Sequence, residues 1–408
     1  MSSPVYLDTA RMGKVSPRAM AIQTDYLRFS AERGCSEAIS HLLVRGGGAW
    51  PSRLRRKYPV LATWRGVAPL KQRLRQIVGA DDESRVMLAG RSHVLMMLAS
   101  YLLFRNCETA LTVDLAWRPY QEILEQVAGR LGRQLVKVPV GQMVYRGVQT
   151  RYVTDVIVAA FRESRSAGLF LPAISHDGVK LPVRSIADAI KRERELRFFA
   201  VDGAQHLAHG DASFTEMDCD FYLAGTHKWL RSLYPLGVGV YGHPRSCDMI
   251  DTTVAELHVA GILTDPLTQF VSQLESQKLD GVTETVNLSG LLAAHGAMLD
   301  ARPSSARRRI LPTQLANANT VSALAEDAGW RPVLPAAEFR SGILLLRPPT
   351  TWGGDSVALR NHFERRGVAA STYDNGVVRF SMPRRGLTSD DLKPIHRSLD
   401  ISFLSSRL

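Results

Sequence analysis

The chain has 408 residues and is poor in cysteine, with four scattered positions at Cys35, Cys107, Cys219 and Cys247. These spacings suit neither a disulfide framework nor a zinc site, so we expect no metal and a reducing compartment, the cytoplasm. Long apolar runs are also missing. The longest one, 94–104, is far too short to span a bilayer and indicates a buried helix instead.

The N-terminal residues show neither a basic n-region nor an apolar h-region, so we expect no cleaved signal peptide. Low-complexity tracts and internal repeats are absent, and 45% of residues are hydrophobic, as in globular proteins. A chain of 408 residues is long enough for two domains. Basic residues outnumber acidic ones, giving a net charge of +12, with clusters at 53–75 and 307–309. These clusters either attract an anionic partner or form solvated helix faces, and we favour solvated faces. Their pattern of aromatic and basic residues does not predict a nucleic-acid platform.

Apolar segments alternate with amphipathic ones in the first three quarters of the chain, as in a mostly parallel sheet covered by helices on both faces. After about residue 295 the composition changes, which indicates a smaller α/β domain. We therefore predict an N-terminal segment at 1–18, a large domain at 19–295 and a small domain at 296–408. The predicted strands are 109–113, 135–138, 169–174, 198–201, 221–224, 238–241, 343–346 and 377–381, and the predicted helices are 94–104, 120–131, 182–196, 288–297 and 388–399.

Two polar residues follow neighbouring apolar strands. Asp202 ends the strand in 198–202, and Lys228 lies just beyond the strand in 221–224. Ligands of such sheets bind at the carboxyl ends of the strands. A lysine amine can form a Schiff base with an aldehyde, and a carboxylate can keep a heterocyclic nitrogen protonated, which is the pair that pyridoxal phosphate (PLP) needs. The alternative is a structural carboxylate and a surface lysine.

The surrounding residues resemble the class V aminotransferase family. Its pattern of aliphatic-Asp-Gly-Ala-Gln/His, Asp-Phe, His-Lys-Trp and Pro-x-Gly is filled here by 201–205, 220–221, 227–229 and 235–237. The resemblance covers nearly the whole chain and is sharp at 175–240 and near 379. It implies the α/β architecture of PLP-dependent fold type I, with a large, mostly parallel, seven-stranded sheet domain and a small C-terminal α/β domain.

The resemblance also implies which residues hold the cofactor phosphate. Residues 88–93 occupy the place of the family's phosphate turn, ahead of an apolar helix. Ser92 supplies a hydroxyl there, whereas Arg91 either contacts the phosphate or points to solvent. Thr226 and His227, next to Lys228, are further candidates for the phosphate oxygens.

Three more residues are expected around the cofactor ring. Trp117 stands where relatives place a stacking residue, with a core tryptophan as the alternative. Gln205 resembles the residue that hydrogen-bonds the phenolic oxygen, with His206 as second choice. Ser175 begins the family's Ser-His segment, on a loop that is shorter here than in most relatives.

Two positions toward the C-terminus complete the expected site. Thr285 resembles the threonine that reaches the phosphate bound by the other subunit, which implies a homodimer with composite active sites. Arg379 resembles the arginine that pairs with the substrate α-carboxylate. An edge-strand surface arginine is the alternative, and Arg384 and Arg385 are possible substitutes.

The implied activity is formation of an external aldimine with an amino acid or amino-acid conjugate, followed by Cα deprotonation by Lys228. Residues 343–378 contain no cysteine, which argues against a cysteine desulfurase. The run 226–230 is similar to the isopenicillin N epimerase-like subgroup, so we favour lyase chemistry such as C–S elimination in specialised metabolism. An aminotransferase or epimerase is the alternative, and a catalytically silent PLP-fold binding protein is the remote one. We expect a small-molecule substrate and no nucleic-acid or membrane partner.

Overall fold

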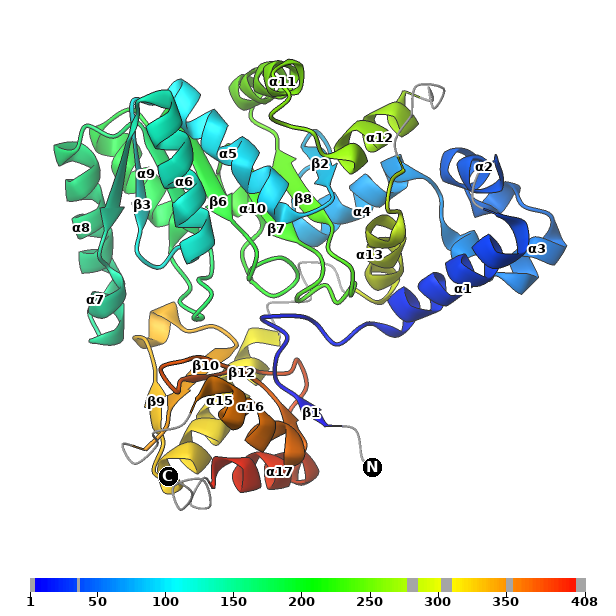
Figure 1. The fold of residues 1–408 in the computed structure, drawn as a ribbon. Coiled ribbons are helices and arrows are strands. Elements are labelled where there is room, and N and C mark those ends of the chain that lie inside the picture. The colour runs from blue at the N-terminus through cyan, green and yellow to red at the C-terminus, as the bar shows by residue number, and fades with distance from the viewer. Residues whose placement is uncertain (1–3, 35–36, 277–284, 302–309, 350–354, 401–408) are drawn as a thin grey trace.

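The computed structural model describes residues 4–34, 37–276, 285–301, 310–349 and 355–400, which form a large and a small unit (Figure 1). Seven strands make the sheet of the large unit, in the order β2-β8-β7-β6-β5-β3-β4. Only β8 runs antiparallel to its neighbours. The mostly parallel α/β sheet predicted from the sequence is therefore confirmed. The strands are β2 (Arg85–Ala89), β3 (Thr109–Val113), β4 (Gln134–Val138), β5 (Gly168–Pro172), β6 (Phe198–Asp202), β7 (Phe221–Gly225) and β8 (Gly237–Tyr241).

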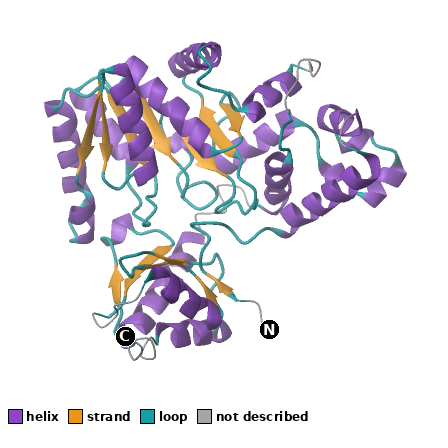
Figure 2. Cartoon of the chain, in the orientation of Figure 1, coloured by secondary structure: helices purple, strands orange, loops and turns teal. Residues whose placement is uncertain are grey.

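Helices cover both faces of this sheet (Figure 2). One face is covered by α5 (Ser92–Asn106), α6 (Arg118–Leu131) and α11 (Pro244–Val259). The other face is covered by α4 (Val67–Val78), α8 (Thr150–Glu163) and α9 (Val183–Glu193). Because α5 is apolar around most of its circumference, it is almost entirely buried, as a helix without a polar face must be.

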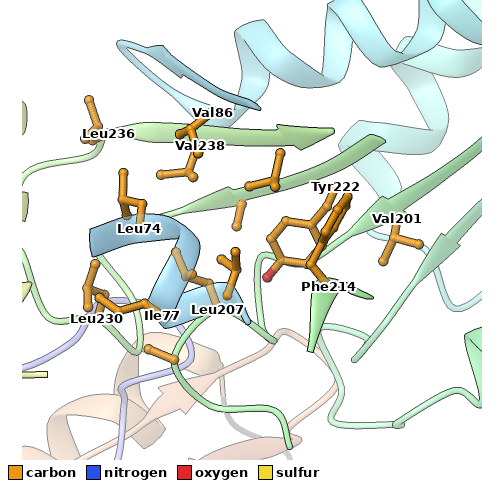
Figure 3. Packing of buried hydrophobic residues seen from close by; sticks show 14 of the residues in the cluster. Leu74, Ile77, Val86, Val201, Leu207, Phe214, Tyr222, Leu230, Leu236 and Val238 are labelled. Carbon is orange, nitrogen blue, oxygen red and sulfur yellow. The ribbon is translucent and has the colours of Figure 1, made fainter. Parts of the chain in front are cut away.

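The core beneath β6, β7 and β8 joins the sheet to the loops of the functional site. Figure 3 shows Tyr222 of β7 beside Phe214, with Leu74 and Ile77 of α4 packed toward Leu207 and Leu230. Leu207 follows Asp202, and Leu230 follows Lys228. The same apolar packing that stabilises the sheet therefore fixes the loops that carry both polar residues.

The region before Gln76 is a series of helices. They are α1 (Pro17–Arg33), α2 (Glu37–Arg45), α3 (Ser52–Lys57) and α4, with the 3-10 turns η1 (Gly47–Ala49) and η2 (Leu61–Thr63) between them. Helix α1 packs on α13 (Ser289–Asp300), where a Cβ on Gly296 would lie 2.6 Å from the Arg18 carbonyl oxygen. The predicted domain division after residue 295 falls inside α13.

Further helices connect these parts of the large unit. They are α7 (Gly141–Tyr145), α10 (Phe214–Met217) and α12 (Pro266–Glu275). None of the helices within the described ranges is long and apolar enough to cross a membrane.

The small unit is an antiparallel sheet in the order β12-β13-β10-β9, backed by helices (Figure 1). The N-terminal strand β1 pairs in parallel with β11 of this unit, so the chain begins beside its own C-terminal part. The elements are β1 (Val5–Tyr6), α15 (Ile310–Asp327), β9 (Arg331–Val333), η4 (Ala337–Phe339), β10 (Ile343–Arg347), α16 (Ser356–Arg365), β11 (Val368–Ala369), β12 (Ser371–Thr372), β13 (Val378–Ser381) and α17 (Ser389–Leu399).

The turn after Asp202 depends on a glycine, which leads to a test. A Cβ on Gly203 would lie 2.0 Å from the ring of the buried Tyr222. We expect Gly203→Ala to lower the free energy of unfolding by about 1–3 kcal/mol, because the rigid ring has to move. The measurement is the midpoint of urea denaturation. Gly129→Ala is the matched control: Gly129 is an exposed position of α6 with open space around it, where alanine should stabilise by about 0.5–1 kcal/mol. Equal midpoints for the two variants would contradict the packing argument.

Candidate active site

A cavity of about 460 Å³ lies where the carboxyl ends of β6 and β7 face the small unit, and we call it the main cavity. Asp202 ends β6, and Gly225 ends β7 three residues before Lys228, so neighbouring strands deliver both polar groups to one place. Seven residues expected from the sequence line the main cavity: Ser92, Trp117, Asp202, Gln205, His227, Lys228 and Arg379.

Burial shifts the pKa values of Asp202 and Lys228 in opposite directions. Burial raises the pKa of Asp202 to about 6, although the Ala204 N–H, 2.8 Å from Oδ1, and the charge of Lys228 both favour the carboxylate. Burial lowers the pKa of Lys228 to about 8, against the attraction of Asp202, and the charge of Arg379 lowers it further. Desolvation outweighs the mutual attraction in both groups. Lys228 therefore carries an unusually large neutral fraction near pH 8, as a nucleophile or proton acceptor requires.

One end of the main cavity has the properties of a phosphate site. Helix α5 begins there after Arg91, and no side chain caps its first turn, so its N–H groups remain available to an anion. Ser92 Oγ accepts a hydrogen bond from Tyr120 Oη at 2.9 Å. His227 Nδ1 is buried without a partner within the described residues. A Cβ on Gly225 would lie 3.0 Å from the His227 ring and 3.6 Å from Ser92 Oγ, so the glycine keeps this space open.

Arg379 lies at the opposite wall, on β13 of the small unit, and it is buried. Its guanidinium donates to the His176 carbonyl oxygen at 3.0 Å and to Ser371 Oγ at 3.1 Å. Ser371 in turn donates to Asp8, whose carboxylate lies 4.0 Å from Arg379. Arg379 Nε has no partner among the described residues. A planar cation held in this way can pair with a carboxylate in two-pronged geometry.

Four expected residues do not line the main cavity. Ser175 is buried in a turn, where its Oγ accepts from the Val179 N–H, and Thr226 Oγ1 accepts from Ser232. Arg91 is exposed. The pKa of His227 is lowered chiefly by burial, then by the charge of Lys228, and the charge of Arg91 makes a smaller contribution in the same direction. Thr285 is exposed within this single chain. The cofactor contacts of these four residues stay predictions.

Gln205 lines the main cavity, and its side-chain amide also forms hydrogen bonds with the surrounding protein. It accepts from Trp229 Nε1 and donates to the Ala10 carbonyl oxygen, both at 2.8 Å. His206, the second choice, is buried against Tyr222 and does not line the main cavity.

The proposed substitutes for Arg379 have other partners. Arg384 donates to the backbone oxygens of Ala208 and Trp229, and Arg385 pairs with Asp391. Arg379 is therefore the arginine of this segment that the fold presents to the cavity.

Other lining residues had no clear signal in the sequence. For Tyr120 the available signal was its spacing of three residues from Trp117, and in the structure the two rings are 5.1 Å apart. His176 directly follows Ser175 and lines the cavity in its place. The remaining polar lining residues come from the N-terminal segment and the small unit, where no motif marks them: Arg11, Arg360, Ser371, Thr372 and Tyr373.

Comparison with known proteins agrees with this geometry. Residues 71–248 match the model of the family described as aminotransferase class-V, a segment that contains both Asp202 and Lys228. This match supports the class V aminotransferase family. No curated protein sequence matches the chain.

Solved structures share the fold at low sequence identity. A cysteine desulfurase from Thermococcus onnurineus is 13% identical, with a TM-score of 0.68 and coverage of 99% of this chain and 95% of that one. Alanine–glyoxylate aminotransferase from Nostoc sp. is 13% identical, with a TM-score of 0.66 and coverage of 100% and 96%. A C-DES variant with glycine covalently linked to its PLP cofactor is 13% identical, with a TM-score of 0.67 and coverage of 98% and 97%. These likenesses establish fold type I for this chain.

The family match and the fit of the cavity support pyridoxal phosphate as the cofactor. The helix start with Ser92 and His227 suits the phosphate, Asp202 suits the ring nitrogen, and Lys228 suits the aldehyde.

The charges around Lys228 generate a prediction for the protein without cofactor. Its amine should titrate near pH 8, because burial disfavours the ammonium form. Asp202→Asn should lower this pKa further, since the carboxylate favours the charged amine, and Arg379→Gln should raise it. The measurement is NMR of the lysine amines after methylation with ¹³C-formaldehyde, followed against pH. Titration near 10.5, the ordinary pKa of a lysine amine, in all three proteins would contradict the assignment.

Proposed function

We propose that the protein is a PLP-dependent enzyme acting on an amino acid or an amino-acid conjugate. The observation that carries this proposal is the partly buried Lys228, with its lowered pKa, in one cavity with the buried Asp202 and Arg379. A catalytically silent binding protein would have no need of a lysine amine and a carboxylate that are both held out of water, since burying them is costly.

When bound, PLP supplies an electron-accepting ring that acidifies the substrate Cα–H. Asp202, which lines the same cavity, would hold a proton at the ring nitrogen, because the charge of its carboxylate favours the protonated form. Lys228 Nζ accepts and returns the proton at Cα. Arg379 binds the substrate carboxylate and thereby fixes which Cα bond faces Lys228. Residues of the N-terminal segment and of the small unit line the cavity together with those of the sheet domain.

For the reaction that follows, we infer lyase-type chemistry such as C–S elimination. The similarity of residues 226–230 to the isopenicillin N epimerase-like subgroup supports this choice. None of the cysteines in the described part of the chain lines the main cavity, so no desulfurase-type thiol is near Lys228. An aminotransferase is the second candidate, favoured by neighbours such as alanine–glyoxylate aminotransferase. Product analysis separates the two, because elimination proceeds without an added keto acid and releases ammonia, whereas transamination requires an acceptor.

The cofactor assignment has a direct test. Borohydride reduction of the protein loaded with PLP should attach the cofactor to Lys228, identified by peptide mapping. Lys228→Ala should lose both this attachment and at least 10³-fold in activity, since removal of the nucleophile and base typically costs this order of magnitude. Lys180→Ala is the control, because Lys180 pairs with Asp211 outside the main cavity and should change neither property. A pyridoxyl group on another lysine would overturn the proposal.

We further propose a homodimer in which Thr285 reaches the cofactor phosphate of the partner subunit. Thr285 is exposed shortly before α13, at the position that resembles the family's cross-subunit turn. A ligand that bridges subunits stabilises the assembled state.

Removal of PLP should therefore weaken the dimer, measured by sedimentation at several protein concentrations. Thr285→Ala should raise the PLP concentration needed for half-maximal activity by about tenfold, the loss expected for one hydrogen bond to a charged group. Thr320→Ala, an exposed threonine on α15 whose Oγ1 bonds its own helix, is the control. A monomer with full activity would refute the composite site.

A further inference from the structure

A second cavity of about 480 Å³, here called the side cavity, adjoins the main one. The two share His176 and Tyr373 as lining residues, so these side chains form the boundary between them. The side cavity lies between α7 of the large unit and strands β9 and β10 of the small unit, elements that Figure 1 shows facing each other. The Val144 carbonyl oxygen accepts from the Ala336 N–H at 3.3 Å, which joins these two walls.

The boundary and the floor of the side cavity carry polar groups without partners. Tyr145 Oη and His176 Nδ1 are buried, and neither has a hydrogen-bond partner within the described residues. His176 Nε2 is occupied, because it lies 3.1 Å from Asp177 Oδ1. Buried polar groups in native proteins are nearly always satisfied, so these two atoms, on residues that line the side cavity, are available for hydrogen bonds to water or to a ligand.

The outer part of the side cavity is cationic. Arg146 at the end of α7 and Arg347 at the end of β10 both line it, and in the part of the chain that the structure describes neither forms an ion pair. Arg331 lies opposite Arg347 in the β9–β10 ladder and adds a like charge nearby. Asp177 is the acidic lining residue, and its carboxylate faces His176. Unpaired guanidinium groups around a cavity favour an anionic ligand.

We propose that the side cavity is the subsite for the remote end of the substrate. The substrate is then an α-amino acid conjugate whose side chain has a polar link and a terminal anion. Its α-carboxylate pairs with Arg379, its link passes His176 and Tyr373 and bonds Tyr145 Oη, and its terminal anion meets Arg146 and Arg347. This inference rests on the proposed function, since the main cavity has to hold the cofactor and thus leaves little room for a long side chain.

The test uses two probes that differ in the terminal anion alone. L-γ-Glutamylglycine has an amide link and a terminal carboxylate, and L-γ-glutamylethylamide ends in a methyl group instead. Binding is measured by calorimetry on the borohydride-reduced protein, in which the cofactor is fixed and no turnover occurs. We expect the carboxylate probe to bind about tenfold more tightly. The double variant Arg146→Gln/Arg347→Gln should abolish this preference, whereas the matched control Arg331→Gln, which lines neither cavity, should keep it.

Tyr145→Phe tests the polar link separately and should weaken both probes by the same factor, because both contain the amide. Equal binding of the two probes to the unmodified protein would overturn the subsite, as would a preference that survives in the double variant. Failure of the proposed function would look different. Borohydride would then leave no pyridoxyl group on Lys228, before any probe is added.

Discussion

The site is organised around a partly buried amine and a buried carboxylate that share one cavity. Desolvation dominates over attraction at Lys228 and Asp202, which is why the pKa of the amine is lowered while that of the carboxyl is raised. Such a pair is unfavourable for folding by itself, because each buried charge loses hydration. The packed sheet provides the stability that permits it. Leu207 and Leu230, which follow the two polar residues, are anchored in the core under β6, β7 and β8.

The N-terminal segment links the parts of the site that the large and small units supply. The Gly13 N–H donates to the His227 carbonyl oxygen at 2.8 Å, next to Lys228. The Ala10 N–H donates to Ser381 Oγ at 2.9 Å, at the end of the strand that carries Arg379. The carboxyl group of Asp8 lies near three arginines, Arg379, Arg11 and Arg360. Its negative charge reduces the electrostatic repulsion among their guanidinium groups. The N-terminal segment therefore contacts both units at the site.

The loop after Lys228 contains two residues with an unfavourable backbone conformation. Arg231 and Leu233 have φ angles of 67° and 69°, in the left-handed region that is unfavourable for residues other than glycine. Tertiary contacts compensate for this strain: Arg384 donates to the Trp229 carbonyl oxygen at 2.8 Å, and Arg231 Nε donates to that of Lys14 at 2.7 Å. The small unit and the N-terminal segment therefore help to fix the direction of the lysine.

Much of the sheet could be predicted from the sequence, because short apolar runs bounded by polar turns are typical of buried parallel strands. The strand 109–113 matches β3, and most other predicted strands of the sheet lie within two residues of those observed. Several elements of the large unit were missed, among them β2, which carries the exposed Arg85, and the helices α8, α11 and α12.

For the site, local sequence determined Asp202 and Lys228, since each lies at or shortly after the end of an apolar strand, whereas the resemblance to the class V family indicated Ser92. Only the tertiary structure decided that His176 rather than Ser175 faces the cavity, and that Arg360 and Tyr373 join Arg379 there. It likewise brought α7 against β9 and β10 to form the side cavity. The physical reason is that periodicity along a chain reports which face of an element is buried, whereas the groups that meet across a domain seam depend on contacts between segments far apart in sequence.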